Sequence, residues 1–106
     1  MIHVLIKKRN SIVDMKVTGH AESGPYGHDL VCASVSSACV GIANALEERG
    51  FTEKKLGTID VQEGFVQIKV QEFHSDIQVV LETFEILLKT IEESYAKYIE
   101  ITEMEV

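Results

Sequence analysis

Five short segments of the chain have the residue pattern of β-strands, either alternating hydrophobic and polar positions or a run rich in β-branched residues. These segments are residues 2–6, 13–18, 56–61, 66–70 and the stretch around Ile99 and Ile101. The polar connection Arg9-Asn10-Ser11 favours a hairpin between the first two. Glu63-Gly64 is typical of a tight turn and predicts a second hairpin between the next two.

Two longer segments carry hydrophobic residues at three- and four-residue spacing, which predicts helices. The first runs from Leu30 to about Arg49, and Gly50 follows it as a C-terminal cap. Its first half is rich in Ala, Ser and Gly, and we expect these small residues to let the helix approach the sheet closely. The second helix begins near Ser75, which with Gln78 forms a capping-box pattern. Its predicted buried stripe comprises Ile77, Val80, Leu81, Phe84, Leu87, Leu88, Ile91 and Tyr95.

The resulting order, β-β-α-β-β-α-β, predicts an α+β fold with a mostly antiparallel sheet and two helices packed on one face. The 106 residues are enough for one hydrophobic core but too few for two, so we expect residues 1–106 to form a single domain. The order of the strands within the sheet does not follow from the pattern.

Charge and composition narrow the classes of partner. The formal net charge of −7 disfavours direct nucleic-acid binding and suits a basic partner. We find no apolar run approaching the ~20 residues of a membrane helix and no signal-peptide pattern, so we expect a cytoplasmic protein without a membrane contact. Cys32 and Cys39 lie on one predicted helix, ~10 Å apart, which is beyond the reach of a disulfide.

The strongest candidate for chemistry is the junction between the second predicted strand and the first predicted helix. Asp29 has the residue type of an N-cap, which places Cys32 at the third helical position, where the helix dipole favours a thiolate. His20 ends the preceding strand, and the Gly-rich loop between them can bring the imidazole to the sulfur. A cysteine activated by a histidine is the basis of nucleophilic thiol catalysis.

Each of these residues also has a structural interpretation. Cys32 could be a small buried hydrophobe, and Cys39, on the apolar stripe in mid-helix, is expected to belong to the core. Asp29 either caps the helix or accepts a hydrogen bond from His20 and orients its imidazole. Ser36, one turn after Cys32, either hydrogen-bonds at the site or packs.

The spacing of residues along the chain supports neither a metal site nor a nucleotide site. His20, His28, Asp29 and Cys32 are potential ligands, but they match no zinc pattern, and we expect no metal. The loop Gly24-Pro25-Tyr26-Gly27 lacks the spacing and the following Lys of a phosphate-binding loop. His3 and His74 are not assigned a role.

The run Gly19-His20-Ala21, followed by Gly27-His28-Asp29-Leu30-Val31-Cys32-Ala33 with Ser34 and Ser36, resembles the ribosomal-processing cysteine protease family. The resemblance implies that His20 and Cys32 form a catalytic dyad, with Asp29 and Ser36 in supporting positions. It also implies the activity of the family, removal of an N-terminal extension from a large-subunit ribosomal protein precursor by cleavage after an aromatic residue. A homodimer is implied as well.

Under this interpretation the Cys32 thiolate attacks the scissile carbonyl, and His20 accepts and returns the proton. Backbone N–H groups at the helix start are the expected oxyanion donors, and no cofactor is needed. We expect a mobile substrate-binding loop to close over the substrate; it comprises Ala21, Glu22, Ser23, Gly24, Pro25, Tyr26, Gly27 and His28. The alternative is a non-catalytic acidic binding module that docks on a basic ribosomal or assembly-factor surface, with Cys32 buried.

Overall fold

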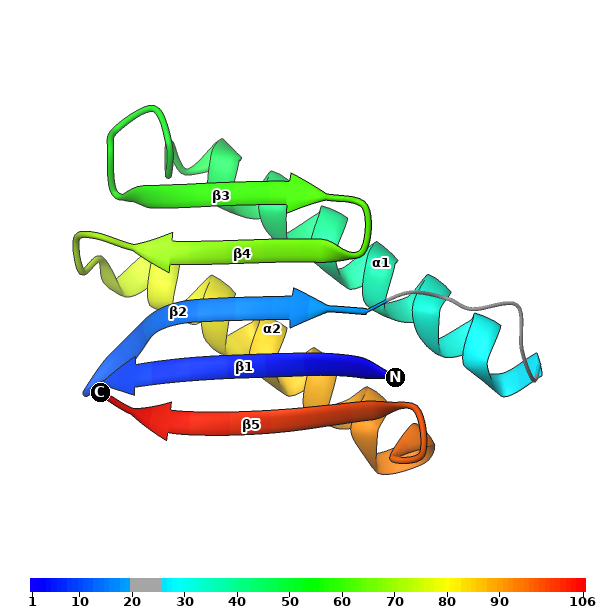
Figure 1. Cartoon of the computed structure of the whole chain (residues 1–106). Helices are drawn as coiled ribbons and strands as arrows, with labels where there is room; N and C mark the ends of the chain where they lie inside the picture. The colour runs from blue at the N-terminus through cyan, green and yellow to red at the C-terminus, as the bar shows by residue number, and fades with distance from the viewer. Residues whose placement is uncertain (20–25) are drawn as a thin grey trace.

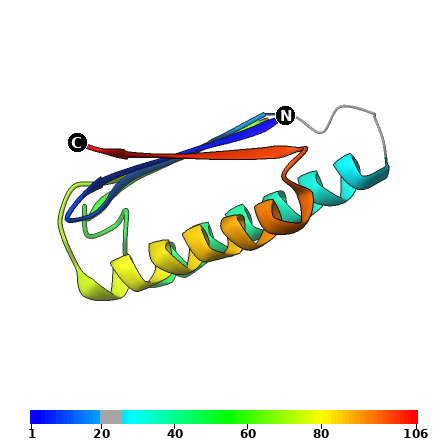
Figure 2. The same cartoon turned by 90° about the horizontal axis from the view of Figure 1, so that it is seen from below.

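The computed structural model describes the backbone of residues 1–19 and 26–106, and the side chains of residues 1–19 and 30–106. Its elements, in order, are β1 (Ile2–Arg9), β2 (Ser11–Thr18), α1 (Tyr26–Glu48), β3 (Gly57–Gln62), β4 (Phe65–Val70), α2 (Ser75–Tyr95) and β5 (Ile99–Glu105). The predicted order is confirmed. Both helices cover the same face of one sheet, as predicted (Figure 1, Figure 2).

The five strands lie in the order β3-β4-β2-β1-β5. All neighbouring pairs are antiparallel except β1 and β5, which are parallel, so the prediction of a mostly antiparallel sheet is confirmed. Both predicted hairpins are present, and each turns at a residue with positive φ, Asn10 at 63° and Gly64 at 68°. A register shift between Lys7 and Lys8 marks a bulge near the first turn.

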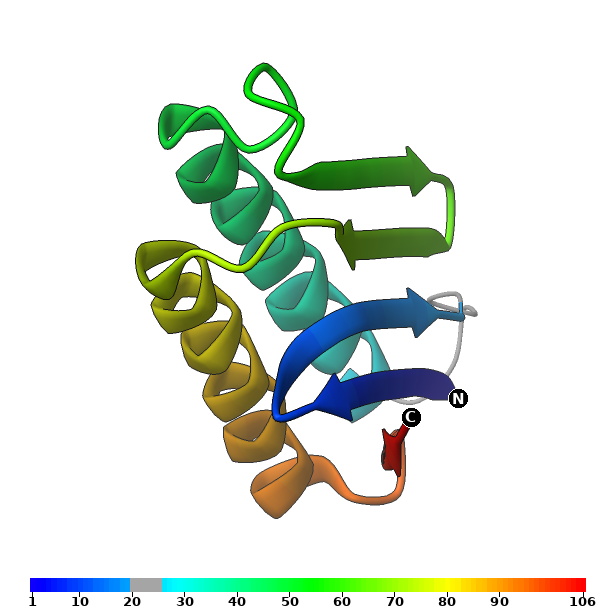
Figure 3. The same ribbon diagram turned by 90° about the vertical axis from the view of Figure 1, so that its left-hand side faces the viewer.

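The core lies between the sheet and the helix layer (Figure 3). Alternate strand residues point into it, and the largest fully buried side chains include Ile6, Met15, Leu46, Phe51, Ile68, Leu81 and Phe84. The core also requires a glycine. A Cβ on Gly57 would overlap the Lys69 carbonyl oxygen and the Phe51 ring, so the start of β3 approaches both closely only without a side chain.

Helix α1 ends as its sequence predicts. Gly50 has a φ of 74° and donates its N–H to the Glu47 carbonyl at 3.0 Å, while Phe51 N–H bonds the Leu46 carbonyl at 3.1 Å. Among the described residues, the stretch Leu30–Glu48, with a mean hydropathy of 1.5, is long and apolar enough to cross a membrane by length and composition. The sequence pattern did not indicate this, because serines interrupt the apolar positions. A core helix meets the same criteria, and Val31, Val35, Ile42 and Leu46 are all buried.

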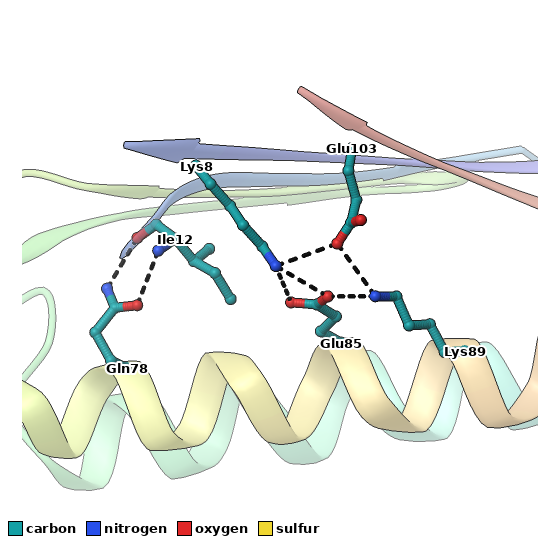
Figure 4. Close-up of polar contacts among 6 residues, drawn as sticks. All are labelled: Lys8, Ile12, Gln78, Glu85, Lys89 and Glu103. Atoms are coloured by element: carbon teal, nitrogen blue, oxygen red, sulfur yellow. Dashed lines mark hydrogen bonds and ion pairs between the residues drawn. The ribbon is translucent and has the colours of Figure 1, made fainter. Parts of the chain in front are cut away.

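The predicted capping box of α2 is wrong. The helix begins at Ser75, and His74 occupies the N-cap with no side-chain hydrogen bond. The Gln78 side chain instead accepts a bond from Ile12 N–H at 2.9 Å and donates to the Ile12 carbonyl at 2.8 Å (Figure 4). Gln78 therefore satisfies both backbone polar groups of the buried residue Ile12, beside the bulge. The predicted stripe is otherwise confirmed for five residues that are buried, Ile77, Val80, Leu81, Phe84 and Leu88, whereas Leu87 is 41% exposed.

Four charged side chains join α2 to β1 and β5 (Figure 4). The Lys8 and Lys89 ammonium groups each contact both Glu85 and Glu103, at distances between 2.6 and 3.1 Å. Burial alone would lower the pKa of Lys8, but the hydrogen bonds to Glu85 and Glu103 outweigh this effect. The pKa values of Lys8 and Lys89 are therefore both raised. Hydrogen bonding to Glu85, Lys89 and Lys8 lowers the pKa of Glu103 to about 2.

Candidate active site

A groove of about 600 Å³ lies between α1 and the adjoining ends of β2, β3 and β4. Its floor is one face of α1, made by Cys32, Val35, Ser36, Cys39, Val40, Ala43 and Asn44. Its roof is formed by one row of paired strand residues, Val17, Val66 and Val61, together with the turn at residues 62–65. Most of the lining is aliphatic, so the groove can accommodate apolar side chains of a peptide.

The small residues of α1 do not bring the helix onto the sheet, and that prediction is wrong. Helix α1 packs chiefly against α2, and the groove separates it from β3 and β4. Short side chains such as Ser36 and Ala43 leave open space above the helix instead, because no large residue fills it.

Cys32 lies in the groove, on the second turn of α1, and its side chain is only 9% exposed. The helix begins at Tyr26, which is earlier than predicted. Asp29 therefore lies within the first turn rather than at the N-cap. The N–H groups that lack a partner inside an α-helix are those at its very start, so Cys32 is not at the helix end and its own N–H is not a spare donor. The predicted position of Cys32 at the third helical residue is wrong for this reason.

Cys39 lies two turns further along the same face. It is 6% exposed, and burial raises its pKa to about 11. A thiol with so high a pKa is almost entirely protonated at neutral pH and is a poor nucleophile. The prediction that Cys39 belongs to the core is confirmed, and Cys39 also lines the groove floor.

The end of β2 is attached to the roof of the groove. Gly19 donates its N–H to the Gly64 carbonyl at 3.0 Å, which ties this strand end to the β3–β4 turn. Gly19 has a φ of 125°, and a Cβ there would lie 2.5 Å from the Met1 carbonyl oxygen. Only glycine fits this position, and it immediately precedes His20 in the sequence.

Several predicted site residues lie outside the described part of the chain. They are His20 and Ala21 to Pro25, and the side chains of Tyr26, His28 and Asp29. The predicted loop extends too far, because the backbone of residues 26–28 belongs to α1. Among the side chains that are described, no three His, Cys, Asp or Glu residues come together as a potential metal site.

Ser36, predicted either to pack or to hydrogen-bond at the site, is exposed and lines the groove one turn after Cys32. Sequence reasoning missed the opposite wall, formed by residues 61–66. These residues show only the alternation of an ordinary hairpin. Their closeness to Cys32 depends on the pairing of β4 with β2, which no local pattern reveals.

The profile of the family described as cysteine protease Prp matches residues 1–100. The chain belongs to the Prp family. It is 31% identical over 102 residues to the ribosomal processing cysteine protease Prp of Staphylococcus aureus strain Mu50, covering 94% of each chain. It is 29% identical over 111 residues to the Prp of Bacillus subtilis strain 168, covering 96% of each.

The fold of the chain is also that of a solved Prp. The crystal structure of the essential ribosomal processing protease Prp from S. aureus, in complex with a covalently linked product peptide, superposes with a TM-score of 0.80. That pair is 30% identical, and the alignment covers 97% of this chain and 99% of the other. As a member of the Prp family the protein is a cysteine protease, which decides against the non-catalytic binding module.

Proposed function

We propose that this Prp-family protease removes the N-terminal extension of a large-subunit ribosomal protein precursor, cutting after an aromatic residue. The observation that carries the proposal is the position of Cys32, the cysteine matched to the family nucleophile, in an open apolar groove. The S. aureus relative with a covalently linked product peptide supports a peptide as the substrate. The net charge of −7 suits a basic ribosomal protein.

In the proposed mechanism the Cys32 thiolate attacks the scissile carbonyl carbon, and a bond forms between Sγ and that carbon. His20 accepts the thiol proton and then gives it to the leaving amine as the C–N bond breaks. Water, deprotonated by His20, hydrolyses the resulting thioester and restores the free enzyme. No cofactor takes part in these steps.

Two residues are proposed to support the dyad. Ser36 lines the same groove one turn after Cys32, and it is proposed to hydrogen-bond with a bound peptide. Asp29, in the first turn of α1, is proposed to orient His20 rather than to cap the helix, since the helix begins before it. The oxyanion donors are proposed to be backbone N–H groups at the start of α1, one turn ahead of Cys32.

Substrate contacts are also proposed for Ala21 to Pro25, the segment between His20 and the start of α1. The protein is further proposed to act in the cytoplasm and as a homodimer, with neither nucleic acid nor membrane as a direct partner. The dimer is tested by light scattering at high micromolar concentration. A mass near the 11.8 kDa of one chain would count against it.

The deciding experiment mixes the purified protein with a ribosomal protein precursor that carries an N-terminal extension. We expect a shortened product whose new N-terminus follows an aromatic residue, as read by mass spectrometry. Cys32→Ala and His20→Ala should each abolish the product while preserving the circular dichroism spectrum. Cys39→Ala is the matched control, because it removes the other groove thiol, and it should remain active. A fully active Cys32→Ala would overturn the assignment.

A further inference from the structure

Among the described residues that line the groove, Glu63 is the only charged one. It lies in the β3–β4 turn, and its side chain is exposed. No hydrogen bond or ion pair engages this carboxylate within residues 1–19 and 30–106, whereas Glu85 and Glu103 on the helix side of the sheet each contact two lysines. The groove thus contains one negative charge for which the described chain supplies no cation.

The position of Glu63 near the reacting end of the groove is constrained. The next residue, Gly64, accepts the hydrogen bond from Gly19, the residue before His20. The turn that carries Glu63 is therefore attached to the strand end that leads to the proposed dyad. A substrate side chain that reaches Glu63 would belong to a residue close to the cleaved bond.

The surroundings of Glu63 favour a long cationic side chain. Val61 and Val40 also line the groove and are 61% and 59% exposed, so each presents an apolar surface to solvent. Lys and Arg place their aliphatic stems along such surfaces while the charged head remains at a polar site. The amide of Asn44 adds an oxygen acceptor to the same lining. An acidic substrate residue would instead meet a like charge.

We propose that Glu63 is a specificity-determining residue that selects peptides with a Lys or Arg within three residues of the scissile bond. This inference rests on the proposed function, because it assigns a second substrate feature to the same groove. The aromatic residue and the basic residue would be recognised separately, the first by apolar contact and the second by charge. Ion pairs at exposed positions are weak, so the preference is modest.

The test uses ten-residue peptides with a single Phe at the cleavage position. A Lys, Gln or Glu is placed in turn at each of three positions on either side, in a background of Ala and Ser. For the wild-type protein we expect kcat/KM to be about 3- to 5-fold higher with Lys than with Gln at one or more positions, and lower with Glu. This preference should shrink in 0.5 M salt, because exposed charges are screened.

Three variants decide whether Glu63 is responsible. Glu63→Gln should cleave Lys and Gln peptides equally well, and Glu63→Lys should prefer the Glu peptide. Glu53→Gln is the matched control, because it removes one exposed carboxylate that does not line the groove, and it should keep the preference for Lys. A Lys preference that survives in Glu63→Gln, or an equal loss in Glu53→Gln, overturns the inference and leaves the protease assignment intact. If folded wild-type protein cleaves none of the peptides and no precursor, both the proposed function and the inference fail.

Discussion

The two thiols on the groove floor should react very differently with an alkylating agent. Iodoacetamide added to the native protein is expected to label Cys32 and to spare Cys39. Both side chains are largely buried, but burial raises the pKa of Cys39 to about 11, and Cys32 is the proposed nucleophile of the groove. The thiolate is the reactive form, so its population sets the rate.

The size of the effect on Cys39 follows from its pKa. At pH 8 a thiol of pKa about 11 is ionised to about one part in a thousand, against about one part in ten at the ordinary value of 9.0. The more basic thiolate is intrinsically more nucleophilic, which recovers about 8-fold of this 100-fold loss. The two effects together therefore slow Cys39 by about 10-fold, and its 6% exposure slows it further.

The assay follows alkylation by intact-mass spectrometry in two single-thiol variants, Cys32→Ala and Cys39→Ala. Because its titration is centred near pH 11, the labelling rate of Cys39 should still rise through pH 10 without reaching a plateau. In concentrated guanidinium chloride both thiols should react at the same rate, which controls for reagent quality.

Equal labelling of native and unfolded Cys39 at pH 8 would refute the argument from burial. Rapid labelling of native Cys39 with no labelling of Cys32 would instead refute the choice of nucleophile. The two failures are separate, because the first concerns the environment of one thiol and the second concerns the assignment of the site.

Three further predictions concern the scaffold. Gln78→Ala leaves two buried backbone groups without partners, and the free energy of unfolding in urea should fall by about 2–4 kcal/mol; a loss below about 1 kcal/mol would contradict the role of this side chain. Gly57→Ala should destabilise the fold by about 1–3 kcal/mol in the same assay. The control is Gly41→Ala. A Cβ at this helical position would meet no heavy atom within 4 Å, and alanine favours a helix more than glycine, so the change should be neutral or stabilising. The folded-state pKa of Glu103 is lowered to about 2, so its carboxylate stabilises the fold above about pH 4.5 and this contribution is lost as pH falls towards 2. Glu103→Gln should flatten that dependence, measured by thermal unfolding, by less than about 1 kcal/mol because the side chain is 45% exposed; an unchanged profile would count against the network.

The elements of this fold are predictable from the sequence because their signals are local. The turns at Asn10 and Gly64 and the helix end at Gly50 are set by residues that tolerate positive φ. The start of α1 is not predictable in the same way. Asp29 has the residue type of an N-cap and Gly27 that of a loop, yet the helix begins at Tyr26.

Long-range partners explain the other differences. Gln78 matches a capping box by spacing, but its amide bonds the backbone N–H and C=O of Ile12, a residue that is distant in sequence and close only in the folded protein. The groove depends on where α1 sits relative to the β3–β4 hairpin, and small residues in a helix are equally compatible with close packing and with an open space. The candidate nucleophile could be predicted from its motif, whereas the wall that contains Glu63 could not.

The two walls of the groove differ in how freely they can change during evolution. The floor shares Cys32, Val35 and Cys39 with the hydrophobic core, so larger or charged side chains there would disturb folding as well as the groove. The roof ends in an exposed hairpin tip, and among the described strands β3 pairs only with β4. Substitutions or insertions at this tip can alter which peptides are accepted at little cost in stability, so relatives with the same groove floor are free to diverge in substrate preference through this one turn.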